Sequence, residues 1–489
     1  MKTTYRLFID GTWQDGERGT RDVFNPSTEE VVASIPVAGP VDLDRALAAA
    51  AREFTAWART SASRRAEMLS RAAAILAGRT AQVAQRMACE QGKPLPEAQA
   101  ELERARETFL WSARHADELC KPVEIDERRM LLYHPVGVVA AFTPWNYPAV
   151  LTARKLASAL AAGCTVILKA AEEAPAAAVA IIEALQEAGV PPGVTGLVFG
   201  KPAMISAHLL ASPDVRMLTF TGSTRVGKEL AALAAGNLQR CVLELGGHSP
   251  VLVFADADIA TAVRAICDYK FEYAGQSCNA PSRIFVERSR YTDFAHELVR
   301  IAAAIRVGGA EDTDVRMGPM IGSQGPARMQ RLTEDALAKG ARLLLGGRRL
   351  ERKGHFWPPT VLADVPSFAA IMSEEPFGPI LAIAPFDTMD EAIELANGTS
   401  YGLASYVFTS SQKTQVDVAE RLSCGSVGIN MLKGVAPDVP LAGTRDSGYG
   451  LEGGEQGFRA FQNVKLVNRT GAWIAPGLDE VAKNLATVR

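Results

Sequence analysis

Two side chains able to form or break covalent bonds stand 34 positions apart in the chain: the carboxylate of Glu244 and the thiol of Cys278. Glu244 lies in the run CVLELGG, between two leucines and just before Gly246 and Gly247. Partial burial disfavours the charged form of a carboxylate, so we expect the pKa of Glu244 to rise toward the range of a general base. The alternative for a glutamate at a strand end is an ion pair with an arginine.

Cys278 stands in the small-residue turn GQSCNA, where its thiol can reach a ligand. A reactive thiolate needs stabilisation, and no cation sits beside Cys278 in the sequence. The seven cysteines are scattered and contain no C-x-x-C pair; they are at positions 89, 120, 164, 241, 267, 278 and 424. This distribution argues against a disulfide framework and a structural zinc site, and we expect the other six to be buried thiols.

Three further polar stretches each follow an apolar run. FTPWNYP holds Asn146 between two prolines, where its amide could donate to a developing oxyanion or close an Asx turn. LKAAEEAP places Lys169 and Glu172 past a strand end, where they could hold the sugar of a nucleotide or form an exposed ion pair. FTGSTRVGK opens a helix, so Ser223 and the free N–H groups of the first turn form an anion site, although the pattern is no G-x-G-x-x-G fingerprint.

The elements that must position these groups alternate along the chain. From residue 136 short apolar runs alternate with helical stretches, and a second alternation begins near 250. Continuous apolar strands separated by helices predict parallel sheets covered on both faces, with ligands at the carboxyl ends of the strands. We therefore predict an α/β fold of two doubly wound, Rossmann-like domains. Residues 41–120 read as amphipathic helices, and 121–134 and 456–469 as exposed strands that form a small β excursion.

Composition excludes several classes of partner. The 489 residues carry a net charge of -3, which offers no basic surface to nucleic acid or anionic lipid. The N-terminus lacks the features of a secretory or transit peptide, and prolines interrupt the most apolar run, 135–153. We expect a cytoplasmic protein that acts on a small molecule without a metal.

Taken in order, these stretches resemble the aldehyde dehydrogenase superfamily. The resemblance is to NAD(P)-dependent members that do not acylate coenzyme A, and the pattern is nearest to that of succinate-semialdehyde dehydrogenase-like members. The motifs span nearly the whole chain; they are FNPSTEE, TPWNYP, LKAAEE, FTGSTRVG, LELGGHSP, FEYAGQSC, EEPFGP and LAGTRDSGYGLEGG. With the element order, the resemblance implies a dinucleotide-binding domain at 1–115 and 135–246 and a catalytic domain at 247–446. The segments 116–134 and 447–489 are then oligomerisation segments and a C-terminal tail.

The resemblance also implies a role for each matching residue. Cys278 matches the nucleophile, Glu244 the general base, and Asn146 the amide that stabilises the oxyanion. Residues matching cofactor contacts are Thr143, Pro144, Trp145, Lys169, Glu172, Gly222, Ser223, Leu245, Glu375 and Phe377. Residues assigned to the substrate are Arg154, Glu272, Ser277 and Ser447. The implied reaction oxidises an aldehyde, such as a semialdehyde, to the carboxylate through a thiohemiacetal and a thioester on Cys278.

Charge argues for NAD over NADP as the cofactor. A glutamate at position 172 would accept hydrogen bonds from ribose hydroxyls, whereas a 2′-phosphate against it would be repelled. We therefore expect NAD to be preferred.

Two features of the sequence bear on the substrate in opposite directions. Arg154 and Ser447 match residues with which succinate-semialdehyde members bind the substrate carboxylate. Those members have an arginine where this chain has Glu272, and Tyr273 replaces an asparagine common in the family pattern. Glu272 could pair with Arg154, point away from the substrate, or favour aldehydes that bear an amine or hydroxyl.

Other functions of the same fold stay open. They are transfer of the acyl group to coenzyme A, a thiol esterase, and a non-catalytic scaffold. Retention of both Cys278 and Glu244 favours a hydrolytic dehydrogenase. The resemblance further implies a homodimer or homotetramer, assembled through an excursion such as 121–134.

These assignments predict that Cys278→Ser abolishes aldehyde-dependent reduction of the nicotinamide cofactor, because a serine hydroxyl is a far weaker nucleophile than a thiolate. The measurement is the absorbance of the reduced nicotinamide with a panel of aldehydes, with and without coenzyme A. Unchanged oxidation by the serine variant would contradict the assignment of the nucleophile.

Overall fold

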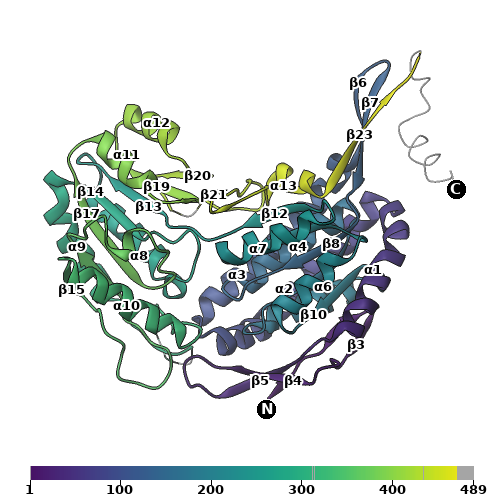
Figure 1. The fold of residues 1–489 in the computed structure, drawn as a ribbon, viewed down its shortest axis with the longest axis horizontal. Coiled ribbons are helices and arrows are strands. Elements are labelled where there is room, and N and C mark those ends of the chain that lie inside the picture. Colours follow the sequence, from purple (N-terminus) through teal and green to yellow (C-terminus); the bar gives the residue numbers. More distant parts are fainter. Residues whose placement is uncertain (1, 311, 313, 433, 471–489) are drawn as a thin grey trace.

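The computed structural model describes residues 2–310, 312, 314–432 and 434–470. Two sheets, each covered by helices, form two lobes, and a small sheet projects from one of them (Figure 1). The predicted α/β architecture with two mainly parallel sheets is confirmed. The last part of the predicted tail, 471–489, lies outside the described residues. Among the helices that the structure describes, none is both long and apolar enough to cross a membrane.

The first sheet has the order β22-β12-β11-β8-β9-β10-β2-β3. Its five central strands are parallel; they are β8 (Val138–Phe142), β9 (Thr165–Lys169), β10 (Thr195–Val198), β11 (Val215–Thr221) and β12 (Arg240–Glu244). The antiparallel edges are β2 (Leu7–Ile9), β3 (Thr12–Gln14) and β22 (Gly448–Tyr449). Every residue of β8 and β9 is buried, as expected for strands covered on both faces.

Helices cover both faces of this sheet. Those that connect its strands are α4 (Pro148–Ala162), α5 (Pro175–Glu187), α6 (Pro202–Ala211) and α7 (Thr224–Ala235). The predicted amphipathic region forms α1 (Pro40–Arg59), α2 (Ala62–Gln91) and α3 (Leu95–Cys120). Helix α3 packs along both α2 and α4, so the N-terminal part of the chain is built into the first lobe.

The second sheet has the order β15-β16-β17-β14-β13-β19-β20, and only β15 is antiparallel to its neighbour. Its strands are β13 (Pro250–Val253), β14 (Arg283–Glu287), β15 (Arg342–Leu345), β16 (Thr360–Ala363), β17 (Ile380–Phe386), β19 (Ala404–Phe408) and β20 (Ser426–Ile429). Its helices are α8 (Ile259–Lys270), α9 (Tyr291–Ala303), α10 (Gln324–Ala338), α11 (Met389–Asn397) and α12 (Gln412–Arg421). Each sheet packs into its own hydrophobic cluster.

A three-stranded antiparallel sheet projects from the first lobe (Figure 1). It consists of β6 (Val123–Asp126), β7 (Arg129–Pro135) and β23 (Gln462–Asn468). The prediction of exposed strands holds for 121–134, but in 456–469 it is wrong for the first residues, which belong to helix α13 (Gly454–Ala460). The buried Phe458 anchors that helix in the first core, and the strand begins only after it.

Shorter elements complete the fold. β1 (Thr3–Thr4), β4 (Thr20–Phe24) and β5 (Val31–Pro36) form one small sheet, and β18 (Tyr401–Gly402) pairs with β21 (Thr444–Arg445). The 3₁₀ turns are η1 (Glu272–Gly275), η2 (Arg288–Arg290) and η3 (Ala370–Met372).

The strand order identifies where a ligand can enter the first sheet. In chain order the five parallel strands lie side by side as 3-2-1-4-5, so the direction of winding reverses between β8 and β11. Loops diverge at such a point and leave a crevice beyond the carboxyl ends of the strands. The segments that leave these two ends are 143–147 and 222–223, the predicted cofactor and oxyanion loops.

The second sheet faces this crevice with its opposite edge. Cys278 precedes β14, Phe377 precedes β17, and Gly247 precedes β13. These three strands are neighbours, so their amino ends lie together. The rule that ligands bind at the carboxyl ends of parallel strands therefore describes the first sheet. The second sheet contributes its site residues from the amino ends of its strands.

Candidate functional site

A cavity of about 510 Å³ lies between the two sheet edges. The predicted site residues on its wall are Pro144, Trp145, Asn146, Arg154, Gly222, Ser223, Leu245, Glu272, Ser277, Cys278, Glu375 and Phe377. Those that lie off the wall are Thr143, Lys169, Glu172, Glu244 and Ser447. Cys278 is half-buried and is the one cysteine that lines this cavity among the described residues.

A glycine brings the Glu244 strand end against the Cys278 turn. A Cβ atom at position 247 would lie 2.2 Å from the carbonyl oxygen of Cys278, a distance that no real side chain tolerates. A Cβ at position 246 would lie 2.7 Å from the Glu375 carboxylate. Gly247 is therefore required by its close approach to the backbone of the Cys278 turn, whereas a Cβ at position 246 would meet only the end of the flexible Glu375 side chain.

The surroundings of Cys278 disfavour its thiolate. Burial, followed by the charges of Glu375 and Glu244, raises the pKa of the Cys278 thiol to about 12, although the backbone N–H groups of residues 278 and 279 oppose that shift. Burial also raises the pKa of Cys267 to about 12 and that of Cys164 to about 11. The pKa thus does not distinguish Cys278 from the packing cysteines. The feature that distinguishes Cys278 is its position on the cavity wall.

Glu244 is a buried carboxylate, and one of its oxygen atoms accepts no hydrogen bond from the described residues. Its Oε1 atom has no hydrogen-bond partner in the described part of the chain. Burial and then the charge of Glu452 raise its pKa well above the ordinary value, against the opposing charges of Lys155 and Arg154. The predicted upward shift agrees in direction. Lys155 and Glu452, which the sequence did not single out, form a buried ion pair, and Lys155 Nζ also donates to Thr219 Oγ1 at 3.0 Å.

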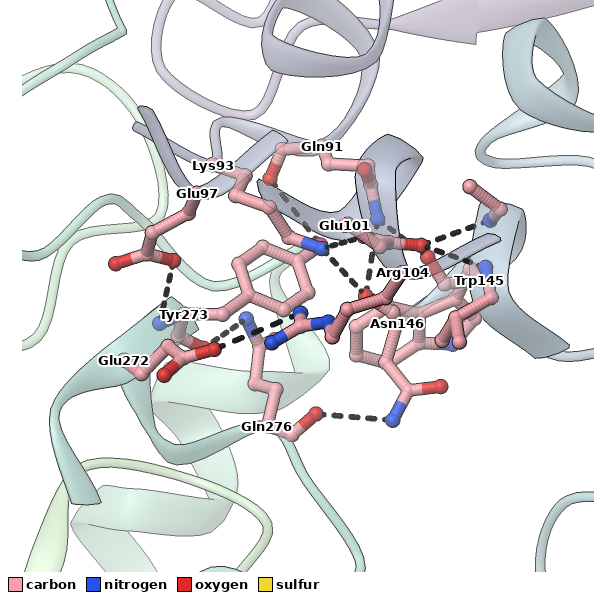
Figure 2. A network of polar contacts seen from close by, with 12 residues as sticks. Gln91, Lys93, Glu97, Glu101, Arg104, Trp145, Asn146, Glu272, Tyr273 and Gln276 are labelled. Atoms are coloured by element: carbon pink, nitrogen blue, oxygen red, sulfur yellow. Dashed lines mark hydrogen bonds and ion pairs between the residues drawn. The ribbon is translucent and has the colours of Figure 1, made fainter. Parts of the chain in front are cut away.

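Hydrogen bonds with three other residues hold Asn146 (Figure 2). Its side-chain Nδ2 donates to the carbonyl oxygen of Gln276, two residues before the thiol, at 3.0 Å. Its own carbonyl oxygen accepts from Lys93 Nζ at 2.9 Å and from Gln91 Nε2 at 3.2 Å. The amide is therefore bound to the nucleophile loop and keeps a second N–H for a ligand.

A fully buried ion pair underlies this loop. Lys93 and Glu101 are 1% and 0% exposed, and the Lys93 ammonium lies 4.4 Å from the ring centres of both Tyr147 and Tyr273. Glu101 Oε1 accepts from the backbone N–H of Ala149, at the start of α4, at 2.7 Å. One charge pair thus joins helix α3, the Asn146 loop and the segment before Cys278 (Figure 2).

Tyr273 is held in a strained backbone conformation. Its φ angle is 44° and that of Ala274 is 51°, in the left-handed region that asparagine tolerates better than tyrosine. This accounts for the asparagine common in the family pattern at that position. Here the Tyr273 N–H donates to Glu97 Oε2 at 3.0 Å and its hydroxyl donates to the Gln91 carbonyl at 3.3 Å, which compensates for the strain.

Arg104, Arg154 and Arg328 line the cavity wall, and the first two bear on the substrate. Arg104, on α3, lies 3.9 Å from Glu272 in an ion pair. Glu272 is among the residues that line the cavity, and it forms an ion pair with Arg104. Sequence reasoning missed Arg104, although its spacing from Glu97 and Glu101 places all three on one helix face. Arg154 is buried, and its Nη1 atom has no hydrogen-bond partner within the described residues.

Groups that suit a dinucleotide gather at the carboxyl edge of the first sheet. Ser223 is the N-cap residue of α7, yet its side chain makes no capping bond. Beside it, the buried Thr221 hydroxyl lines the cavity and finds no partner in the portion of the chain described. Thr143 and Lys169 are joined by a backbone hydrogen bond of 3.2 Å, and Glu172 follows Lys169. A free helix N-terminus with unused hydroxyls fits a phosphate-bearing ligand.

Three predicted residues near the thiol have defined contacts. Glu375 Oε1 accepts from Gly247 N at 3.1 Å, and burial raises its pKa to about 7. Phe377 meets Trp145 edge-on, with ring centres 5.6 Å apart. Ser447 is fully buried, donates to the Gly246 carbonyl at 2.7 Å and accepts from Gly402 N at 3.0 Å. Its contact with substrate stays a prediction, because both bonds are internal to the protein.

Residues 13–467 match the model of the aldehyde dehydrogenase family. The 4-(hydroxymethyl)benzenesulfonate dehydrogenase of Comamonas testosteroni is 43% identical over 94% of this chain and 97% of its own. The NADP(+) succinate-semialdehyde dehydrogenase of Escherichia coli (strain K12) is 37% identical over 94% of this chain and 97% of its own. The crystal structure of an NAD-dependent aldehyde dehydrogenase from Sinorhizobium meliloti has a TM-score of 0.93 at 33% identity, over 97% of each chain.

The pKa analysis predicts that Glu375→Gln accelerates alkylation of Cys278 by iodoacetamide at pH 8. Glu375, with a pKa of about 7, is mostly ionised at that pH, and its negative charge disfavours the Cys278 thiolate. Removing this charge should lower the pKa of the thiol. Each unit by which that pKa falls raises the thiolate fraction about tenfold. The ratio of variant to wild-type rate should approach one near pH 5, where the Glu375 carboxyl is already neutral. Peptide mass spectrometry of cofactor-free enzyme gives the rates.

The matched control is Glu374→Gln, which removes the same charge from an exposed residue paired with Arg331. It should leave the alkylation rate unchanged. Equal rates for wild type and Glu375→Gln at pH 8 would contradict the electrostatic account.

The buried ion pair makes a second prediction. Lys93→Met leaves Glu101 buried without its partner and should destabilise the fold by about 3–5 kcal/mol. The urea midpoint should fall accordingly. Arg64→Met, which breaks the exposed pair with Glu67, should cost less than about 1 kcal/mol. Similar midpoints for the two variants would show that the Lys93 pair does not stabilise this region.

Proposed function

The chain belongs to the aldehyde dehydrogenase family, and from that premise we propose that it oxidises an aldehyde bearing a carboxylate or sulfonate group to the corresponding acid. The observation that carries the choice of substrate is Arg154, whose buried guanidinium lines the cavity beside the thiol. Cys278 is the nucleophile, Glu244 the general base, and Asn146 the amide donor to the oxyanion.

The thiol of Cys278 adds to the aldehyde carbon as a thiolate. Because burial and two carboxylates raise its pKa to about 12, the thiol needs a base at the moment of attack. Glu244, whose pKa is raised by burial and by the charge of Glu452, is the base that accepts this proton. Once Glu244 has passed that proton to solvent, the same carboxylate activates the water that hydrolyses the thioester on Cys278, and the acid is released.

The oxyanion of the tetrahedral adduct needs donors that are already in place. The Nδ2 of Asn146 is held by its bond to the Gln276 carbonyl, and its second N–H is available for the oxygen. The backbone N–H of Cys278 supplies a second donor. Lys93 and Gln91 fix the Asn146 backbone, so little reorganisation accompanies the charge that develops.

The cofactor is a nicotinamide dinucleotide, which when bound supplies the acceptor for hydride. Ser223, Thr221 and the N-terminus of α7 would hold its phosphates, and Lys169 with Glu172 its adenosine ribose. Glu375 and Phe377, on the opposite wall beside Cys278, would orient the reactive ring.

The substrate chemistry follows from the charges on the cavity wall. Arg154 offers an N–H group that no described residue accepts, in surroundings dry enough to lower the pKa of the guanidinium. An anionic substrate group would satisfy that donor. Glu272 does not cancel this attraction, because its ion pair with Arg104 offsets its charge. The names of two relatives, a succinate semialdehyde and a benzenesulfonate dehydrogenase, support this choice.

We further propose that the enzyme is a homodimer or homotetramer joined through the projecting sheet. Apolar side chains of that sheet are exposed in the single chain, namely Val123, Ile125, Val464 and Leu466. An exposed strand edge with apolar side chains is suited to pairing with a second copy.

The test compares succinate semialdehyde with butanal, a neutral aldehyde of the same chain length. Succinate semialdehyde should have the higher kcat/KM. Arg154→Met should lower kcat/KM for the anionic aldehyde by about 100-fold, as expected for loss of a charged hydrogen bond in a buried site, and change that for butanal little. Equal losses on both aldehydes would place Arg154 in the catalytic machinery instead of the substrate site.

A further inference from the structure

An arginine from the N-terminal sheet is paired with Glu172. Arg21, on β4, forms an ion pair between its Nη1 atom and Glu172 Oε2, across 151 positions of sequence. The Glu172 side chain is 7% exposed, whereas that of Arg21 is 61% exposed. The buried end of the pair is thus the carboxylate, and the cation reaches it from the solvent side.

The strand pairing explains how Arg21 reaches this place. Strand β4 pairs with β5, and Arg21 lies opposite Ile35. Beyond β5, the N–H of Ala38 donates to the carbonyl of Phe199, just past the carboxyl end of β10. Since β10 is the neighbour of β9, this connection brings the N-terminal sheet beside the loop that carries Glu172.

The pair changes the charge that a ribose would meet. Lys169 is also buried here; burial, and to a smaller extent the charge of Arg21, lowers its pKa, whereas the charges of Glu172 and Glu173 oppose that shift. An unpaired Glu172 would repel a 2′-phosphate. With Arg21 in place that repulsion is offset, because its guanidinium pairs directly with the Glu172 carboxylate.

We propose that Arg21 is a cofactor-specificity residue that lets the enzyme bind NADP as well as NAD, by neutralising Glu172 and donating to the 2′-phosphate. A guanidinium carries five N–H donors in a rigid fork, and no described residue besides Glu172 accepts from this side chain. Glu172 remains available to the ribose hydroxyls of NAD through its other oxygen.

This inference rests on the proposed function, and it revises one expectation from the sequence. The expected preference for NAD treats Glu172 as a lone carboxylate. Its partner Arg21 lies 151 positions away, so the LKAAEE motif alone does not reveal the ion pair. The two cofactors should therefore bind with similar affinity.

Isothermal titration of the purified full chain with NAD+ and with NADP+ tests the proposal without any turnover. Arg21→Leu should raise the Kd for NADP+ about tenfold or more, which corresponds to about 1.4 kcal/mol, and leave that for NAD+ within about twofold. Arg18→Leu, an exposed arginine three positions earlier, removes the same charge and should leave both values unchanged. Glu172→Gln should shift the preference toward NADP+.

The other outcomes overturn the proposal. If Arg21→Leu raised the Kd values for both cofactors equally, Arg21 would only order the Glu172 side chain. If Arg21→Leu and Arg18→Leu had equal effects, the cause would be the net positive charge of the region and not a specific contact. Wild-type enzyme that binds NAD+ but not NADP+ would also refute the inference while leaving the proposed function intact. Failure of the wild type to bind either dinucleotide would refute both.

Discussion

The backbone contact between Gly247 and Cys278 is the constraint on which the site depends. Here the segment that follows strand β12 of the first sheet approaches the turn before strand β14 of the second sheet. The approach is so close that no side chain fits between the two backbones. Any residue larger than glycine at position 247 would push the thiol away from Glu244. The bond from Asn146 to the Gln276 carbonyl then ties the same turn to the other strand end at the crevice. These two contacts, both to backbone atoms of the turn that carries Cys278, place that turn against the segments that carry Glu244 and Asn146.

The electrostatics of the site follow from that close approach. Burial, together with the charges of Glu375 and Glu244, raises the pKa of the Cys278 thiol to about 12. In the proposed reaction, the thiol therefore gives its proton to a neighbouring base. Around Glu244, the charges of Lys155 and Arg154 oppose the rise in pKa that burial and the charge of Glu452 cause. The site is thus an arrangement of opposed charges in a dry cavity, where each acts strongly on the others.

Helix α3 contributes more to the site than its surface-helix pattern indicated. Lys93, just before it, and Glu101 within it clamp the loop that carries Asn146, and Arg104 offsets the charge of Glu272. An N-terminal segment interpreted as scaffold therefore fixes the Asn146 loop and adds charge to the cavity wall. The Arg21 pair holds Glu172 in the same way, from an element with no motif of its own.

The sequence by itself determined the local structure and the chemical types. Alternating apolar runs predicted the two sheets, because buried parallel strands must be apolar throughout, and the ordered motifs identified Cys278, Glu244 and Asn146. The tertiary structure decided which groups meet: Arg104 with Glu272, Arg21 with Glu172, Lys155 with Glu452, and Ser447 with Gly246. It also decided that the second sheet presents its amino edge to the crevice. Such pairings join residues tens to hundreds of positions apart, and a sequence pattern records periodicity and neighbours but not which distant charges share a cavity.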